Sequence, residues 1–255
     1  LYDDTMMGMM VRTPSGVRLR FRTDAGRLGV RIDASRIVMT PGEIPPVYLD
    51  VAIDGADPVS HAGEGGAVVR IDRSTEPPAF EQIGDGPASF AAELPGTMAD
   101  VDVWLPHNAT GELIAVEVDD GARVEAPTPD ERPKWVHDGS SISQCSEAHS
   151  PSRIWPAVAA RLGGWNLFNL GLGGSCHLDQ FIAQQIRDRP ADRISSCKIG
   201  INIVGGGSLT KRTFRPALHA FLDTVRDGHP DTPLIVASPI WCPYLEDRPG
   251  PGQYV

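Results

Sequence analysis

Residues 134–143 read Lys-Trp-Val-His-Asp-Gly-Ser-Ser-Ile-Ser, a short run around Trp135 and Val136 that leads into a serine-rich turn. The run from Lys134 to His137 is typical of a short strand. Pro151, which suits the first turn of a helix, opens the next helical pattern. A serine at a strand-to-helix junction lies among backbone N–H groups that the helix leaves unpaired. This stretch therefore predicts the start of an α/β domain, with a polar site at the end of its first strand.

The chain beyond this stretch alternates strands with helices. Strands are predicted at Leu167–Leu170, Ile194–Ile201 and Leu234–Pro239. Between them lie three helical patterns, whose apolar faces are Ile154, Val158 and Leu162; Ile182 and Ile186; and Phe214, Leu218, Phe221, Leu222 and Val225. The first helical pattern ends at Gly163-Gly164, and the second starts near Leu178. Strands that alternate with helices imply right-handed crossovers and a parallel sheet, so we expect a flavodoxin-like three-layer α/β/α domain.

The first half of the chain has the pattern of β structure. Apolar and basic residues alternate from Val17 to Arg22, as in a half-buried strand. Further short runs are Leu28–Ile32, Val47–Ile53, Val68–Ile71, Phe90–Leu94, Val101–Leu105 and Leu113–Val118. Closely spaced short strands predict a β-sandwich of jelly-roll type. We interpret the methionines at 6, 7, 9 and 10 as strand or packing residues rather than a metal site.

A proline-rich segment separates the two patterns. Residues 126–133 contain three prolines, and proline fixes φ and lacks a backbone donor, so the segment is predicted to be a semi-rigid linker. We therefore divide the chain into a sandwich at 1–125, the linker at 126–133 and an α/β domain at 134–255.

Composition excludes several classes of function. The 255 residues are 41% hydrophobic and 22% charged, with a net charge of −10, which argues against a nucleic-acid binder because phosphate binding needs clustered Lys and Arg. No apolar stretch approaches the roughly 20 residues that span a bilayer. We expect a cytoplasmic protein, with secretion left open because the chain begins at Leu1 without Met.

The cysteine spacings indicate no zinc site. The spacings of Cys145, Cys176, Cys197 and Cys242 match no zinc pattern, and we expect reduced thiols. Two alternatives stay open: a Cys145–Cys176 disulfide, and metal binding at residues 176–179, which is disfavoured because acidic residues are common at a helix start. Residues 205–211 resemble a phosphate loop but lack its Gly-Lys-Ser/Thr ending, which favours a flexible loop.

Three polar or glycine-rich clusters each follow a predicted strand: residues 139–141, 171–174 and 200–202. In an open parallel sheet the carboxyl ends of the strands lie along one edge, where ligands bind, so these clusters should converge. A serine there can attack a carbonyl while backbone and side-chain N–H groups stabilise the oxyanion. The simpler readings are an N-cap for Ser141, a tight turn for Gly174 and a turn residue for Asn202.

The same clusters resemble the motif blocks of the SGNH (GDSL-like) serine hydrolases. Gly139-Ser140-Ser141-Ile142-Ser143 is similar to the first block, Asn169 to Gly174 to the second, and Gly200-Ile201-Asn202 to the third. The resemblance implies that Ser141 is the nucleophile and that its N–H, Gly174 and Asn202 form the oxyanion hole. It implies an acyl-serine intermediate, with no cofactor and no metal.

A subfamily resemblance rests on Trp104-Leu105-Pro106-His107 and Trp135-Val136-His137 beside the serine block. This subfamily has an N-terminal jelly roll of carbohydrate-binding type, and some members are acyltransferase-like enzymes of polyketide tailoring. The expected partner is thus a small-molecule ester, with an acylated sugar or a polyketide as candidates. An esterase is the leading interpretation; the alternatives are an acyltransferase and a non-catalytic carbohydrate-binding protein.

Two features depart from the SGNH pattern. Ser140 stands where the family usually has Asp, and the Asp-x-x-His block that supplies the base does not occur in residues 1–255. Asp227-Gly228-His229 is one residue short and precedes a predicted strand. His137 and Asp138 are disfavoured as base and orienter, because strand neighbours of Ser141 point away from it. We therefore expect the His and Asp to lie beyond Val255 and the α/β domain to be incomplete at its C-terminus.

Overall fold

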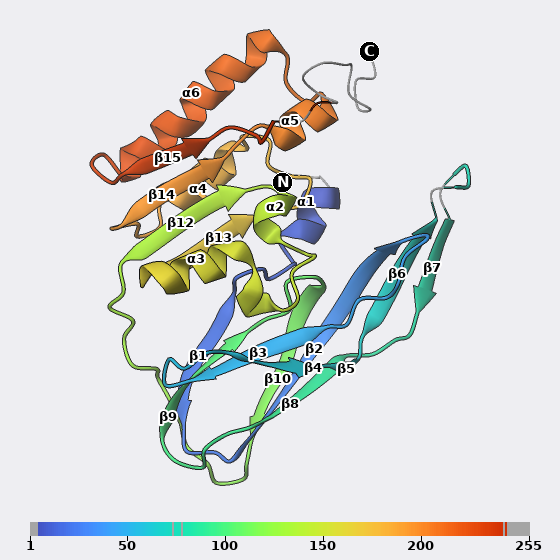
Figure 1. Ribbon diagram of the computed structural model, residues 1–255, viewed down its shortest axis with the longest axis vertical. Coiled ribbons are helices and arrows are strands. Elements are labelled where there is room, and N and C mark those ends of the chain that lie inside the picture. Colours follow the sequence, from blue (N-terminus) through green and yellow to red (C-terminus); the bar gives the residue numbers. More distant parts are fainter. Residues whose placement is uncertain (1–4, 73, 78, 242, 244–255) are drawn as a thin grey trace. The chain divides into compact units, whose positions relative to one another are not determined.

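The computed structural model describes residues 5–72, 74–77, 79–241 and 243 (Figure 1). Internal contacts divide the chain into two compact units. A β unit contains the described residues of Gly8–Asp130 and Ser146–Ile154, and an α/β unit contains residues 5–7, Glu131–Cys145 and the described residues from Trp155 onward. The short helix α1 (Thr5–Met10) spans the point where the chain passes from one unit to the other.

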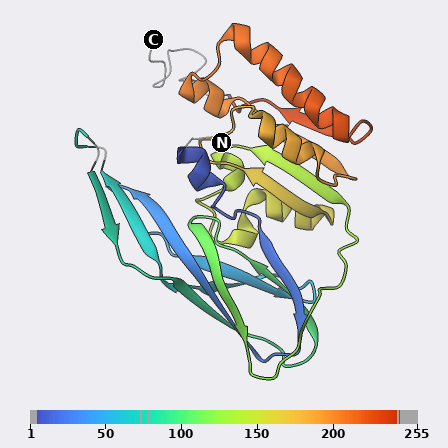
Figure 2. The ribbon, with the colours of Figure 1, turned by 180° about the vertical axis from the view of Figure 1, so that it is seen from behind.

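The β unit is built from two sheets (Figures 1 and 2). The first sheet has the order β11 (Val124–Glu125), β1 (Arg18–Thr23), β9 (Ala99–Trp104), β3 (Tyr48–Ile53) and β4 (Val59–Ala62). The second has the order β5 (Glu64–Gly65), β8 (Ala88–Glu93), β2 (Arg27–Met39), β6 (Ala67–Asp72) and β7 (Ala79–Ile83), with β10 (Thr110–Val118) also paired to β2. The sandwich expected from the alternating pattern is confirmed.

Strand β2 organises the second sheet. Its first half pairs antiparallel with β8 and β10, and its end pairs in parallel with β6. Leu28, Val30 and Ile32 alternate with more exposed residues and are buried, as the period of two requires. They join Val101 and Val103 of β9 in the core of the unit, so the hydrophobic effect fixes the register of both sheets.

A buried carboxylate attaches residues 146–154 to this unit. Asp50 of β3 is fully buried and accepts hydrogen bonds from Ser150 Oγ at 2.7 Å and from the backbone N of Ser152 at 2.8 Å. Such charge-assisted bonds are the strong ones, and leaving their donors unpaired in the interior is costly.

Replacing Asp50 with alanine is therefore expected to lower the free energy of unfolding by about 3 kcal/mol. Urea unfolding followed by circular dichroism measures the change. The exposed Asp85 is the matched control, and its alanine variant should stay within about 0.5 kcal/mol of the parent. Equal midpoints for the Asp50 variant and the parent would show that the carboxylate does not hold this segment.

The α/β unit contains a parallel sheet of order β13 (Asn166–Gly171), β12 (Lys134–Gly139), β14 (Ile194–Lys198) and β15 (Leu234–Ala237). Helix α3 (Trp155–Gly163) covers one face, and α4 (Gln180–Arg187) and α6 (Lys211–Gly228) pack together on the other (Figures 1 and 2). The short helices α2 (Ser141–Gln144) and α5 (Ile201–Gly206) follow β12 and β14. The predicted three-layer α/β/α arrangement is confirmed.

Several details differ from the sequence-based expectations. A 3-10 turn at Pro151–Arg153 precedes α3, which begins at Trp155; Leu162 is 85% exposed, and Ala157 and Ala160 are buried in its place. The strand predicted to reach Ile201 ends at Lys198, because Gly200 adopts a φ of 122° and starts α5. The methionine cluster is helical, in accord with the helix propensity of Met. Strands β4, β5, β7 and β11 were not predicted.

Candidate active site

The three sequence clusters follow adjacent strands of the parallel sheet. Strand β12 lies between β13 and β14, and Gly139 is in register with Gly171. Ser141 follows β12, Gly174 follows β13 and Asn202 follows β14. The structure therefore brings the three clusters to the same carboxyl edge of the sheet, where the strand pattern placed them.

The serines after β12 occupy different environments. Ser140 is fully buried, and its Oγ caps α2 by accepting a hydrogen bond from the backbone N of Ile142 at 3.4 Å. Ser143 is also buried. Ser141 is exposed at the first position of α2, and its Oγ makes no hydrogen bond within the part of the chain that the structure describes. Ser141 is thus the hydroxyl that a substrate can reach.

Side chains on β12 and α3 fix the orientation of α2. Trp155 Nε1 donates to the carbonyl of Ile142 at 2.8 Å, and His137 Nε2 lies 2.8 Å from Ser143 Oγ. His137 Nδ1 lies 2.8 Å from Ser196 Oγ. Both ring nitrogens of His137 are therefore engaged away from Ser141.

Glycine is required where β13 passes α2. A Cβ at Gly171 would overlap the backbone of Ser143 and Gln144. The close approach lets Asn169 Nδ2 donate to the carbonyl of Ser143 at 3.2 Å. The helix that carries the serine is thereby tied to the neighbouring strand.

Hydrogen bonds also connect the glycine loop to the other two clusters. Gln144 Oε1 accepts from the backbone N of Gly173 at 2.8 Å, and Asn202 Oδ1 accepts from the backbone N of Cys176 at 3.1 Å. Because Oδ1 is fixed by Cys176, the Nδ2 group of Asn202 is left to donate elsewhere; it has no hydrogen-bond partner among the described residues. Gly174 has a φ of 67°, a conformation that favours glycine. Both groups can serve as oxyanion donors.

Two buried titratable groups on β12, His137 and Asp138, precede the serine turn. Burial, followed by the charge of Lys198, lowers the pKa of His137 to about 4. Burial raises the pKa of Asp138 to about 7, against the opposing effect of Cys176, whose Sγ lies 3.8 Å from Oδ2. Desolvation disfavours the charged form in both cases.

These shifts predict opposite effects of pH on stability. The contribution of Asp138 to the free energy of unfolding is fully present below its unfolded pKa of 3.8 and is lost as pH rises through about 7. The contribution of His137 is present above 6.5 and is lost as pH falls through about 4. Since the two windows overlap, the two dependences partly cancel in the parent.

Replacing Asp138 with asparagine removes one of the two opposing effects of pH. The effect of His137 should then be visible, and the free energy of unfolding should rise as pH increases from about 4 to 6.5. The variant should also be more stable than the parent by up to a few kcal/mol near pH 8, where the parent holds a buried carboxylate. Chemical unfolding across pH measures both effects, with the exposed Asp223 changed to asparagine as control. If the free energy of unfolding depended on pH in the same way in the Asp138 variant and in the parent, the raised pKa of Asp138 would be contradicted.

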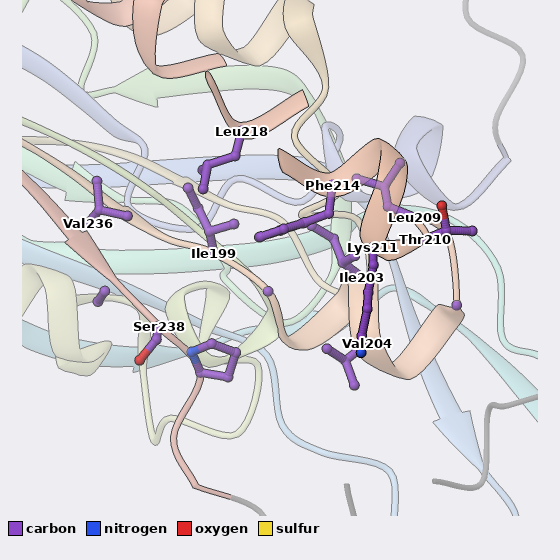
Figure 3. A pocket seen from close by; sticks show the side chains of 14 residues that line it. Ile199, Ile203, Val204, Leu209, Thr210, Lys211, Phe214, Leu218, Val236 and Ser238 are labelled. Atoms are coloured by element: carbon purple, nitrogen blue, oxygen red, sulfur yellow. The ribbon is translucent and has the colours of Figure 1, made fainter. Parts of the chain in front are cut away.

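An apolar cavity of about 620 Å³ lies beside α5, the helix that carries Asn202 (Figure 3). Ile203 and Val204 of α5 line it together with Phe214 and Leu218 of α6. Val236 of β15 also lines the cavity and is 45% exposed. A group bound there would be held mainly by burial of apolar surface.

Other residues singled out in the sequence have structural roles. Cys145, Cys176 and Cys197 are free thiols, so Cys145 and Cys176 form no disulfide; Cys242 lies outside the described residues. No cluster of three or more metal-ligating His, Cys, Asp or Glu occurs in the described ranges. The segment that resembled a phosphate loop contains the end of α5 and Thr210, which caps α6.

Sequence reasoning missed several residues that shape the site. Gln144 and Trp155 hold the glycine loop and α2, and no motif marks them. Met6 of α1 approaches Gly174, since its Cγ lies 3.9 Å from the position that a Cβ at Gly174 would take. This neighbour is far away in sequence, so no local pattern reveals it.

Comparison with known proteins agrees with this geometry. Residues 133–241 match the model of the family described as GDSL-like lipase/acylhydrolase. Over these residues the α/β region is similar to that family. No helix within the described residues is both long and apolar enough to cross a membrane. A search of curated proteins finds no match.

Solved structures extend the likeness to the β unit. A salicylyl-acyltransferase, SsfX3, from a tetracycline biosynthetic pathway is 32% identical, with a TM-score of 0.68 over 87% of this chain and 59% of that one. A Bacteroides ovatus protein described as a GDSL-like lipase is 21% identical, with a TM-score of 0.64 over 91% and 64%. The chain thus spans about three-fifths of the length of these two proteins.

A family two carbohydrate esterase from Clostridium thermocellum, solved with cellohexaose, is 14% identical, with a TM-score of 0.55 over 91% of this chain and 74% of that one. At this identity, as for the Bacteroides protein, the likeness concerns the fold alone.

Proposed function

We propose that the GDSL-like chain is a serine acylhydrolase that cleaves small carboxylic esters through an acyl-serine intermediate. The observation that carries the proposal is the placement of an exposed, unbonded Ser141 hydroxyl on an edge shared with Gly174 and Asn202. Attack of Ser141 Oγ on the ester carbonyl forms a tetrahedral intermediate. The N–H groups of Ser141 and Gly174 and the amide of Asn202 stabilise its oxyanion.

The reaction also needs a base that takes the Ser141 proton and returns it to the leaving alcohol. His137 has both ring nitrogens bonded to serine hydroxyls, and His177 has both bonded to Ser208 and Gly174. We assign the base to neither of them. Water then hydrolyses the acyl-serine with the same base.

A set of model esters tests this proposal. Acetyl, butyryl and aromatic acyl esters of nitrophenol, together with acetylated sugars, are offered to the protein, and the release of acid and alcohol is measured. We expect turnover of at least one acyl class without added metal or cofactor. Rates equal to the buffer blank for every ester would overturn the proposal.

An acyltransferase is the second candidate, because the 32% identical structure is a salicylyl-acyltransferase. The same acyl-serine would then be resolved by an alcohol instead of water. Adding a hydroxylated polyketide or a sugar as acceptor should divert the acyl group into a new ester. An unchanged ratio of acid to ester product across the acceptors would favour the hydrolase.

A further inference from the structure

His177 bridges the loops that carry the two proposed oxyanion donors. Its Nε2 lies 3.0 Å from the carbonyl oxygen of Gly174, and its Nδ1 lies 2.7 Å from Ser208 Oγ, in the segment that follows α5. The ring also lies close to the last turn of α5, since its Cε1 is 3.4 Å from the position that a Cβ at Gly206 would take. The preceding residue, Cys176, donates to Asn202. The two adjacent residues thus contact both donor loops.

The partners of the ring determine its tautomer. A carbonyl oxygen only accepts hydrogen bonds, so the contact with Gly174 requires a proton on Nε2. In the neutral ring Nδ1 is then an acceptor, and the Ser208 hydroxyl donates to it. The histidine therefore joins one fixed backbone acceptor to one rotatable hydroxyl.

The backbone around Gly174 needs hydrogen bonds that hold it in one conformation. Gly174 has no side chain, and its positive φ lies in a region that glycine samples freely. On one side, Gln144 holds the N–H of Gly173; on the other, His177 holds the carbonyl of Gly174. The N–H of Gly174 lies between these two fixed points.

We propose that His177 is a positioning residue of the oxyanion hole, which holds the carbonyl of Gly174 through Nε2 and links it to Ser208 in the segment that follows the helix of Asn202. This role rests on the proposed acylhydrolase function. A misplaced donor stabilises the oxyanion less, whereas it leaves the bound ester nearly unaffected. Loss of His177 should therefore act on kcat rather than on KM.

Two conservative variants separate the contacts of the ring. In His177→Gln the side-chain nitrogen can take the place of Nε2 and keep the bond to Gly174. In His177→Asn the shorter side chain reaches only the position of Nδ1, where its amide can pair with Ser208, and the bond to Gly174 is lost. Because removal of a whole oxyanion donor costs ~10²–10³ in kcat, we expect a roughly 10–100-fold loss in His177→Asn. His177→Gln should stay within about fivefold of the parent, with KM within about twofold for both. The exposed His219 of α6, changed to asparagine, should leave kcat unchanged.

A spectroscopic measurement tests the geometry independently of activity. In ¹⁵N-labelled protein, the neutral ring of His177 should carry its proton on Nε2, and Ser208→Ala should shift the Nδ1 resonance more than the Nε2 resonance. A neutral ring protonated on Nδ1 would overturn the proposed contact.

The kinetic measurements distinguish failure of the His177 proposal from failure of the acylhydrolase proposal. Equal losses of kcat in the glutamine and asparagine variants, or none in either, would overturn the role of His177 while leaving the acylhydrolase proposal standing. A parent that neither hydrolyses esters nor reacts at Ser141 would overturn the proposed function, and with it the catalytic role of His177.

Discussion

Replacing Ser141 with alanine is expected to reduce ester hydrolysis by roughly 10⁴-fold or more. The physical reason is that the variant keeps the oxyanion donors but has no atom that can form the acyl-enzyme bond. Its stability should barely change, because the Ser141 side chain is exposed and its Oγ makes no hydrogen bond within the described residues. Initial rates with a nitrophenyl ester, together with the unfolding midpoint, give both quantities.

Two other serines near the turn serve as controls for this variant. Ser146 is exposed just after α2, and its alanine variant should hydrolyse the ester as fast as the parent. Ser140→Ala removes the N-cap of α2 at a cost of about 1 kcal/mol, and it should still react with an acylating reagent. Activity that survives in Ser141→Ala and disappears in Ser140→Ala would move the nucleophile to Ser140.

Replacing Asn202 with alanine is expected to lower kcat by ~10²–10³ with little change in KM, because one oxyanion donor is removed. Alanine also leaves the backbone N–H of Cys176 without its acceptor, so the loop could shift in this variant. Asn202→Asp separates the two effects. Its carboxylate keeps an acceptor for Cys176 but places negative charge where the oxyanion forms.

The aspartate variant should therefore lose at least as much kcat as the alanine variant while unfolding closer to the parent. Steady-state kinetics and urea unfolding measure the two variants side by side. An Asn202→Asp protein with the kcat of the parent would show that this amide does not face the reacting carbonyl.

Sequence patterns predicted the architecture well where burial produces a clear period. The alternation in β2 and the apolar spacing of Ile182 and Ile186 in α4 correspond to buried faces in the structure. The pattern failed for α3, where small alanines rather than Leu162 face the sheet. Small residues allow close packing but give a weak apolar signal, so hydrophobicity alone selected the wrong face.

The candidate site was predictable only where a residue carries its own motif. Ser141, Gly174 and Asn202 follow strands and match known blocks, so their common edge could be inferred from the order of the elements. The residues that hold these three in place match no sequence motif. Gln144 accepts from the backbone of Gly173 on another loop, and His177 joins the carbonyl of Gly174 to the hydroxyl of Ser208. Those contacts depend on the tertiary fold.

The identity of the residue that a fluorophosphonate probe modifies tests the central claim most directly. The parent protein is treated with the probe and digested, and the adduct is located by tandem mass spectrometry of the peptide that contains residues 139–144. The acylhydrolase account predicts a single adduct on Ser141, which disappears in Ser141→Ala and forms more slowly in Asn202→Ala. An adduct on Ser140, on Ser143 or on a serine outside this peptide, or the same labelling in Ser141→Ala as in the parent, would contradict it.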